Sequence, residues 1–149
     1  MRARHLLLLV LISLVSCLAQ ARQLAIVAEG SATTTNLSSS DLVRIFNAKT
    51  HKWPDGKPII VVLRDPSSSE MEMVLRRLLN MTPEQAGAFI ESHRGEFAVV
   101  DSDAAVIRFV SSTRGAIGVV DLFSLTKDVN VLKIDGKLPV EQGYLLRGN

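Results

Sequence analysis

The segment 64–69, Arg-Asp-Pro-Ser-Ser-Ser, holds the residue types in this sequence that best suit an anion. It follows a β-branched run and precedes residues with helical spacing, so it is predicted to join a strand to a helix. The first N–H groups of a helix lack internal partners, and a guanidinium binds an oxyanion through two parallel hydrogen bonds. The candidate ligand-binding residues are therefore Arg64, Ser67, Ser68 and Ser69. The alternative is a serine-capped helix with Arg64 in a surface ion pair.

Histidines and carboxylates give no comparable site. His51 and His93 lack the spacing to further His, Cys or acidic residues that a metal site requires, and both are expected at the surface. Ser67, His93 and Asp101 have the residue types of a nucleophilic triad, but a triad is defined by geometry. The sequence contains no G-x-S-x-G turn, phosphate loop or dinucleotide fingerprint. We therefore expect a protein that is not an enzyme and that uses no cofactor or metal.

The N-terminal residues have the order of an export signal. Arg2 and Arg4 precede an apolar run over 6–15, and Ala-Gln-Ala at 19–21 is a small-x-small cleavage site. The run is shorter than the roughly 20 residues of a membrane-spanning helix. The sequence predicts a cleaved signal peptide over 1–21 and a periplasmic domain over 22–149. The alternative is a lipoprotein anchored through Cys17, because Leu-Val-Ser-Cys at 14–17 also fits a lipidation box.

Composition restricts the partners of the exported domain. The chain has 149 residues with 17 Lys and Arg against 15 Asp and Glu, and removal of Arg2 and Arg4 leaves 15 of each sign. A domain without net charge is not expected to bind nucleic acid by electrostatics. Cleavage after Ala21 also removes Cys17, the single cysteine, which excludes a disulfide-stapled scaffold. The length is that of one domain.

The hydrophobic pattern after residue 21 alternates between strand and helix signals, which predicts an α/β fold. Helix starts are marked by Ser38, by a capping box from Thr82 to Gln85, and by Ser102. Arg76 and Arg77 are expected as a solvated pair on an exposed helix face. The strands are predicted over 24–27, 58–63, 97–100, 115–120 and 129–134, the helices over 38–48, 70–79, 82–92 and from 102 onward, and a loop over 29–36.

Several segments together resemble the phosphate-binding proteins of ABC transporters. The stretch 37–64 carries LSSSDLVRIF, Lys49, Trp-Pro-Asp-Gly at 53–56 and a strand that ends in Arg64. It is similar to the family pattern LS-x-x-x-L-x-x-IF-x-x-K-x-x-x-W-x-DG-x-PI-x-x-V-x-R. The segments 102–106 (SDAAV), 115–118 (GAIG) and 131–136 (VLKIDG) resemble later motifs of the family in the same order.

The resemblance implies one lobe of a type II periplasmic-binding-protein fold, with a mixed sheet flanked by helices. It implies an exported protein that binds phosphate or another small oxyanion and acts with membrane transporter subunits or a second lobe-like protein. The family loop R-x-x-x-S-G-T is matched by Arg64 and Ser68, but Ser69 replaces its Gly and Glu70 its Thr. Glu70 would bring a negative charge to the anion. The alternative function is therefore a ligand-free protein-interaction module that kept one lobe.

Overall fold

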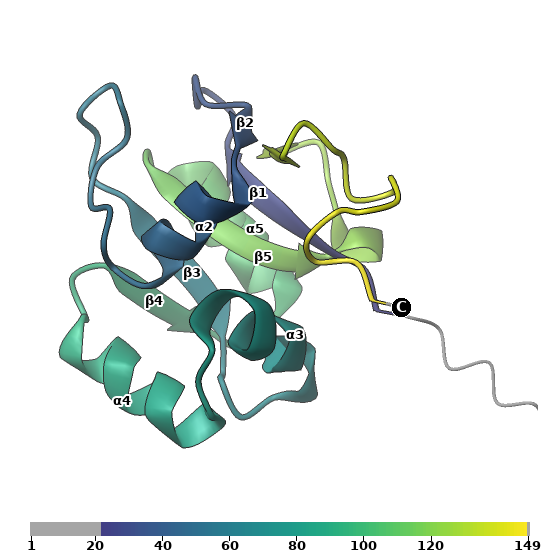
Figure 1. The fold of residues 1–149 in the computed structure, drawn as a ribbon. Coiled ribbons are helices and arrows are strands. Elements are labelled where there is room, and N and C mark those ends of the chain that lie inside the picture. Colours follow the sequence, from purple (N-terminus) through teal and green to yellow (C-terminus); the bar gives the residue numbers. More distant parts are fainter. Residues whose placement is uncertain (1–21, 149) are drawn as a thin grey trace, which may run out of the picture.

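A five-stranded mixed sheet forms the middle layer of the computed structural model, which describes residues 22–148 (Figure 1). The strand order is β4-β3-β5-β1-β6. Strand β3 is parallel to both β4 and β5, whereas β1 is antiparallel to β5 and β6. The five strands are Leu24–Glu29 (β1), Ile60–Arg64 (β3), Phe97–Val100 (β4), Ala116–Asp121 (β5) and Val129–Val131 (β6). The predicted α/β class is confirmed, and the signal peptide predicted over 1–21 lies outside the described residues.

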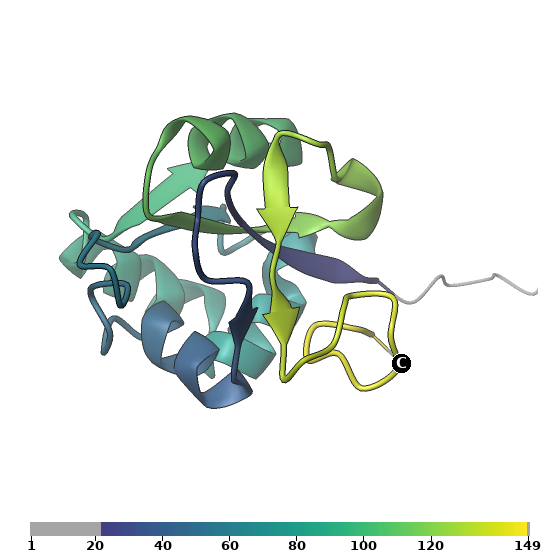
Figure 2. The same ribbon diagram turned by 90° about the horizontal axis from the view of Figure 1, so that it is seen from above.

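Helices cover both faces of the sheet. Helix α5 (Asp103–Ser112) packs on one face, and α2 (Ser39–Phe46) and α4 (Pro83–Ser92) lie on the other, as Figure 2 shows. Alternate side chains of β1 therefore enter different cores: Ile26 belongs to the cluster on the α2 side, whereas Val27 belongs to the cluster under α5. This two-sided burial explains why the strands are apolar at nearly every position.

The predicted helix starts are all present. The Ser38 hydroxyl accepts a hydrogen bond from Asp41 N at 3.0 Å, and the Ser102 hydroxyl caps α5 through Ala105 N at 3.1 Å. Thr82 and the Gln85 side chain form the reciprocal capping box at the start of α4. Each motif is local, so the sequence determines it without help from the rest of the fold.

The single helix predicted over 70–79 is wrong. The chain forms a 3₁₀ turn, Ser69–Met71 (η1), then one α-turn, Glu72–Val74 (α3), and a widened π-turn, Leu75–Leu79 (η2). Asn80 ends it in the left-handed region at φ 51°. Met73 would lie opposite the apolar stripe of a regular helix, yet it is buried, because the end of the chain near Gly148 packs against it.

Two short strands also correct the sequence-based assignment. Asn36–Leu37 (β2) lies at the end of the predicted 29–36 loop and pairs in parallel with Lys133–Ile134 (β7). The predicted strand over 129–134 is thus two strands, since Leu132 separates β6 from β7 and its backbone N–H bonds to Ile26 O at 2.9 Å. Pairing partners about a hundred residues apart leave no signal in a short sequence window.

The chain after β7 has few regular elements but is firmly packed. Tyr144 and Leu146 are buried in the core, and the Tyr144 hydroxyl accepts a hydrogen bond from Ile26 N at 3.2 Å. Gly148 N–H bonds to Arg22 O at 2.8 Å, so the two ends of the described chain lie side by side. Within residues 22–148 no helix has the length and apolar character to cross a membrane.

Candidate anion-binding site

The loop after β3 joins Arg64, the last residue of that strand, to Ser69, the first residue of the next turn, and the hydroxyls of Ser67 and Ser68 face back into it. Asp65 Oδ1 accepts hydrogen bonds from Ser67 N at 2.8 Å and from the Ser67 hydroxyl at 2.7 Å. The Ser68 hydroxyl donates to Asp65 O at 2.6 Å. These two hydrogen bonds from Ser67, of which the one from the hydroxyl has the larger effect, hold the pKa of the Asp65 carboxyl below its usual range.

The helix start expected behind this loop is different in form. Ser68 precedes the three-residue turn η1 and its side chain makes no capping hydrogen bond. A 3₁₀ turn of this length offers few aligned N–H groups, so the anion site lacks the helix dipole assumed from the sequence. Of the alternative, the serine cap is absent, whereas the ion pairing of Arg64 is present.

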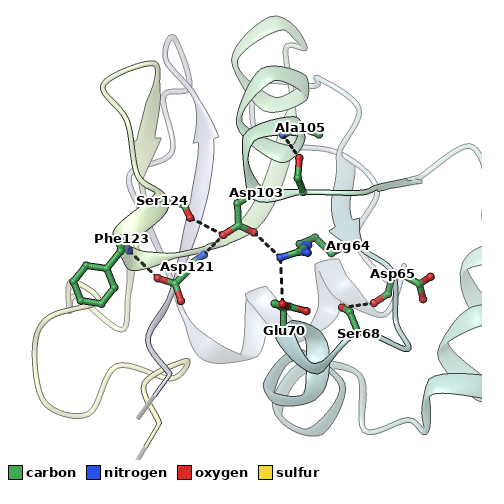
Figure 3. A network of polar contacts seen from close by, with 10 residues as sticks. Arg64, Asp65, Ser68, Glu70, Asp103, Ala105, Asp121, Phe123 and Ser124 are labelled. Atoms are coloured by element: carbon green, nitrogen blue, oxygen red, sulfur yellow. Dashed lines mark hydrogen bonds and ion pairs between the residues drawn. The ribbon is translucent and has the colours of Figure 1, made fainter. Parts of the chain in front are cut away.

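Arg64 lies between two carboxylates, one from η1 and one from the start of α5 (Figure 3). Its Nη1 is 3.7 Å from Glu70 Oε1 and 3.6 Å from Asp103 Oδ1. Both distances exceed a good hydrogen bond, so the two contacts are ionic. Arg64 Nε is buried without a hydrogen-bond partner among the described residues. The guanidinium therefore keeps donors that no described protein group uses.

Asp103, the first residue of α5, forms one of the two ionic contacts to Arg64 and is itself held by hydrogen bonds. It follows the N-cap Ser102, and its Oδ2 accepts hydrogen bonds from Asp121 N at 3.0 Å and from the Ser124 hydroxyl at 2.8 Å. Figure 3 shows the carboxylate joined to β5 on one side and facing Arg64 on the other. Sequence reasoning placed Asp103 only beside a helix cap, since the contact to Arg64 joins elements far apart in the chain.

Charge and space both restrict what can reach Arg64. Two carboxylates lie beside the one guanidinium of Arg64, so the charge nearest to it is negative, although Arg22 lines the same cavity and offsets part of this charge. The carboxyl of Glu70 receives a hydrogen bond from its own backbone N–H and lies near Arg64, which lower its pKa and keep it ionised at neutral pH. The cavity beside Glu70 and Asp103 is about 10 Å³, which is room for a water molecule. An anion must therefore displace Glu70, whose side chain is 37% exposed.

Other candidate residues take structural roles. His51 Nδ1 contacts Glu96 Oε1 at 3.0 Å, and His93 Nδ1 lies 2.8 Å from Phe89 O. Trp53 is buried, and its Nε1 donates to Gly115 O at 2.9 Å. Among residues 22–148 no group of three His, Cys, Asp or Glu side chains is arranged to hold a metal ion.

Comparisons with known proteins agree with this architecture. A family model described as "PBP superfamily domain" matches residues 17–143. No curated protein is significantly similar to the chain. Among solved structures, PstS from Borrelia burgdorferi is 25% identical, with a TM-score of 0.71 and 87% of this chain covered against 55% of that one.

Two further solved structures share the fold at lower identity. An ABC-type phosphate transport receptor from Vibrio cholerae is 20% identical, with a TM-score of 0.63, and covers 86% of this chain and 55% of that one. A phosphate-binding protein from Stenotrophomonas maltophilia is 17% identical, with a TM-score of 0.68, and the match covers 80% of this chain and 40% of that one. The chain spans about half the length of these proteins. The family match, supported by the shared fold, shows that this chain belongs to the PBP superfamily.

Proposed function

We propose that this chain is an exported domain that binds phosphate or a similar oxyanion at Arg64. The observation that carries the proposal is the guanidinium at the end of β3, whose donors remain unused although the side chain is only 22% exposed. Once Glu70 moves aside, such an arginine can donate N–H groups to an oxyanion without breaking hydrogen bonds to the protein. Solved proteins of the same fold are phosphate receptors by name, which makes phosphate the first ligand to test.

Binding proceeds by exchange of one anion for another. Phosphate takes the place of the Glu70 carboxylate beside Arg64, while Asp103 stays fixed by Asp121 N–H and the Ser124 hydroxyl. The hydroxyls of Ser67, Ser68 and Ser69 join the site by turning outward from the loop. Because the anion competes with Glu70 and must approach Asp103, we expect weak affinity, and no bond in the ligand is made or broken.

Calorimetric titration with phosphate, with sulfate as a comparison, tests the site. Arg64→Ala should abolish the heat of binding, whereas Arg108→Ala, which removes an exposed arginine of α5, should retain it. A double variant, Ser69→Gly with Glu70→Thr, completes the family loop and removes the competing carboxylate, so it should bind phosphate more tightly. Unchanged binding in Arg64→Ala refutes the site assignment.

A protein-interaction module is the second candidate function. It is favoured by the two carboxylates that already neutralise Arg64 and by the half-length of the chain relative to the solved receptors. If neither the wild type nor the completed-loop variant releases heat with millimolar phosphate, the result favours a protein-interaction module over an anion-binding protein. A strictly monomeric protein that captures no partner in a pull-down would count against it.

Export and transport are further parts of the proposal. Residues 1–21 are proposed to direct secretion, and the anion-loaded domain would pass its ligand to membrane transporter subunits or to a second lobe-like protein. Mass spectrometry of the secreted protein separates the two processing routes. A chain that starts at Arg22 supports the cleaved signal, whereas a lipid on Cys17 supports the anchored form, and an unprocessed chain contradicts both.

A further inference from the structure

Four arginines gather where the two ends of the described chain meet. Arg22 precedes β1, Arg76 and Arg77 lie in η2, and Arg147 is near the C-terminus. A cavity of about 500 Å³ is lined by Arg22, Arg76 and Arg77, and an adjoining cavity of about 900 Å³ by Arg77 and Arg147. The two cavities share Arg77 and Gly148, so they form one surface, the basic groove.

The basic groove concentrates positive charge within residues 22–149, a part of the chain that has no net charge. Over residues 22–149 the sequence carries 15 basic and 15 acidic residues, since Arg2 and Arg4 account for the other two of 17. Glu72 is the one acidic residue in the lining of either cavity. Within the described part of the chain, none of the four arginines forms an ion pair with a carboxylate. The groove therefore favours an anion, unlike the surroundings of Arg64.

Two of the arginines are held in place by the backbone. Arg77 Nη1 donates to Leu145 O at 2.6 Å and to Arg147 O at 2.8 Å, and Arg147 Nη1 donates to Val140 O at 3.0 Å. Arg77 is thus half-buried, not the solvated residue that the sequence predicted, while Arg76 is exposed as expected. Arg22 Nη1 is buried and has no hydrogen-bond partner among the described residues. Arg77 and Arg147 are thus ordered donors that form no ion pair with a described carboxylate, whereas Arg22 also lies near Glu70 in the adjoining small cavity.

We propose that the basic groove binds a phosphate ester, that is, a phosphate group carried by a larger organic molecule. Planar guanidinium groups match phosphate oxygens in pairs, which favours phosphate over a single-point anion. The cavities are of the size that takes an organic ligand, far larger than the space beside Glu70 and Asp103. Two sources carry this chemistry, a soluble phosphate ester and the headgroup of an anionic phospholipid.

Two probes distinguish the sources. Calorimetry with glycerol 3-phosphate tests the soluble ester. Sedimentation with phosphatidylcholine vesicles that contain about a third phosphatidylglycerol, against vesicles of phosphatidylcholine alone, tests the lipid headgroup. Binding of either probe supports the groove and identifies the source, and failure of both probes to bind the wild-type protein overturns the proposal.

The double variant Arg76→Glu with Arg147→Glu tests whether the groove is the site. Each basic residue at an anionic surface contributes about a fivefold change in affinity, so the loss should be about thirtyfold or more. The matched control is Arg94→Glu with Arg108→Glu, which makes the same change in net charge at exposed positions outside the groove. Equal binding by the groove variant and the wild type, or an equal loss in the control, refutes the assignment.

Two further measurements keep the test decisive. If the double variant fails to fold, Arg76→Ala alone, at an exposed side chain, should still weaken binding about fivefold. Arg64→Ala should leave binding of the phosphate ester unchanged, whereas adding Arg64→Ala to the groove double variant should abolish the heat with inorganic phosphate that remains at Arg64. Because the two sites are tested with different ligands and different variants, a failure of the groove proposal can be distinguished from a failure of the site at Arg64.

Discussion

Replacing Asp103 with Asn is expected to strengthen phosphate binding at Arg64. The Asp103 side chain is 16% exposed, and its Oδ1 lies 3.6 Å from Arg64 Nη1, so it repels any anion that reaches the same guanidinium. The Asn side chain keeps one oxygen to accept the bonds that Asp121 N–H and the Ser124 hydroxyl now donate. The substitution therefore removes the charge and retains the support.

The structure sets the size of this effect. A phosphate oxygen that accepts a hydrogen bond from Arg64 Nη1 lies about 2.9 Å from that atom. Because Asp103 Oδ1 is 3.6 Å from the same atom, the two oxygens are at most about 6.5 Å apart. Two like unit charges at that distance repel by about 2.6 kcal/mol at an effective dielectric of 20 and by about 0.6 kcal/mol in water. Phosphate should bind the variant about three- to eightyfold more tightly.

Isothermal titration calorimetry at fixed ionic strength measures the change. Glu84→Gln is the matched control, because it removes one carboxylate from the exposed first turn of α4 and should leave the affinity unchanged. Thermal unfolding shows whether Asp103→Asn still folds as the wild type does. A folded Asp103→Asn protein whose phosphate affinity is equal or lower would mean that repulsion by this carboxylate does not limit binding.

Three further predictions concern the fold that holds the site. Burial raises the pKa of Tyr144 to about 12, whereas the tyrosine of an unfolded chain has a pKa near 10. The contribution of Tyr144 to the free energy of unfolding is therefore complete below about pH 10 and is lost as the pH rises towards 12. Urea titrations should show that the free energy of unfolding falls more between about pH 9 and pH 11 in the wild type than in Tyr144→Phe. An equal decrease in both proteins would contradict this prediction. Gly118→Ala should lower the free energy of unfolding in urea by about 1–3 kcal/mol, because the new Cβ would lie 2.7 Å from Val106 Cγ1. An unchanged free energy of unfolding would show that α5, which carries Val106, can move aside. Thr82→Ala should lower the free energy of unfolding by about 1 kcal/mol through loss of the capping box, whereas an unchanged midpoint would make the cap dispensable.

Local signals in the sequence predict much of this fold. Ser38, Thr82 and Ser102 begin helices because each hydroxyl bonds a backbone N–H a few residues away. The apolar runs around Ile26 and Val62 form strands because both of their faces are buried under helices. Such features depend on neighbours in the chain, so a short window contains the information that determines them.

The features that the sequence did not predict depend on distant contacts. Asp103 meets Arg64 only because β3 and α5 bring two loops together. Met73 is buried by the chain end, which no periodicity around residue 73 can indicate. At the anion loop, Asp65 accepts the hydrogen bonds of the Ser67 and Ser68 hydroxyls. Local competition for donors decided their orientation, and residue type alone does not reveal it.

The position of β1 has a consequence for the order in which the protein can fold. This strand is near the start of the chain, yet it lies between β5 and β6, and Leu24 pairs with Asp121 about a hundred residues later. During synthesis, β1 emerges from the ribosome long before the two strands that flank it have been made. The five-stranded sheet therefore cannot be completed until β6 has been made, so closure of the sheet is a late step of folding.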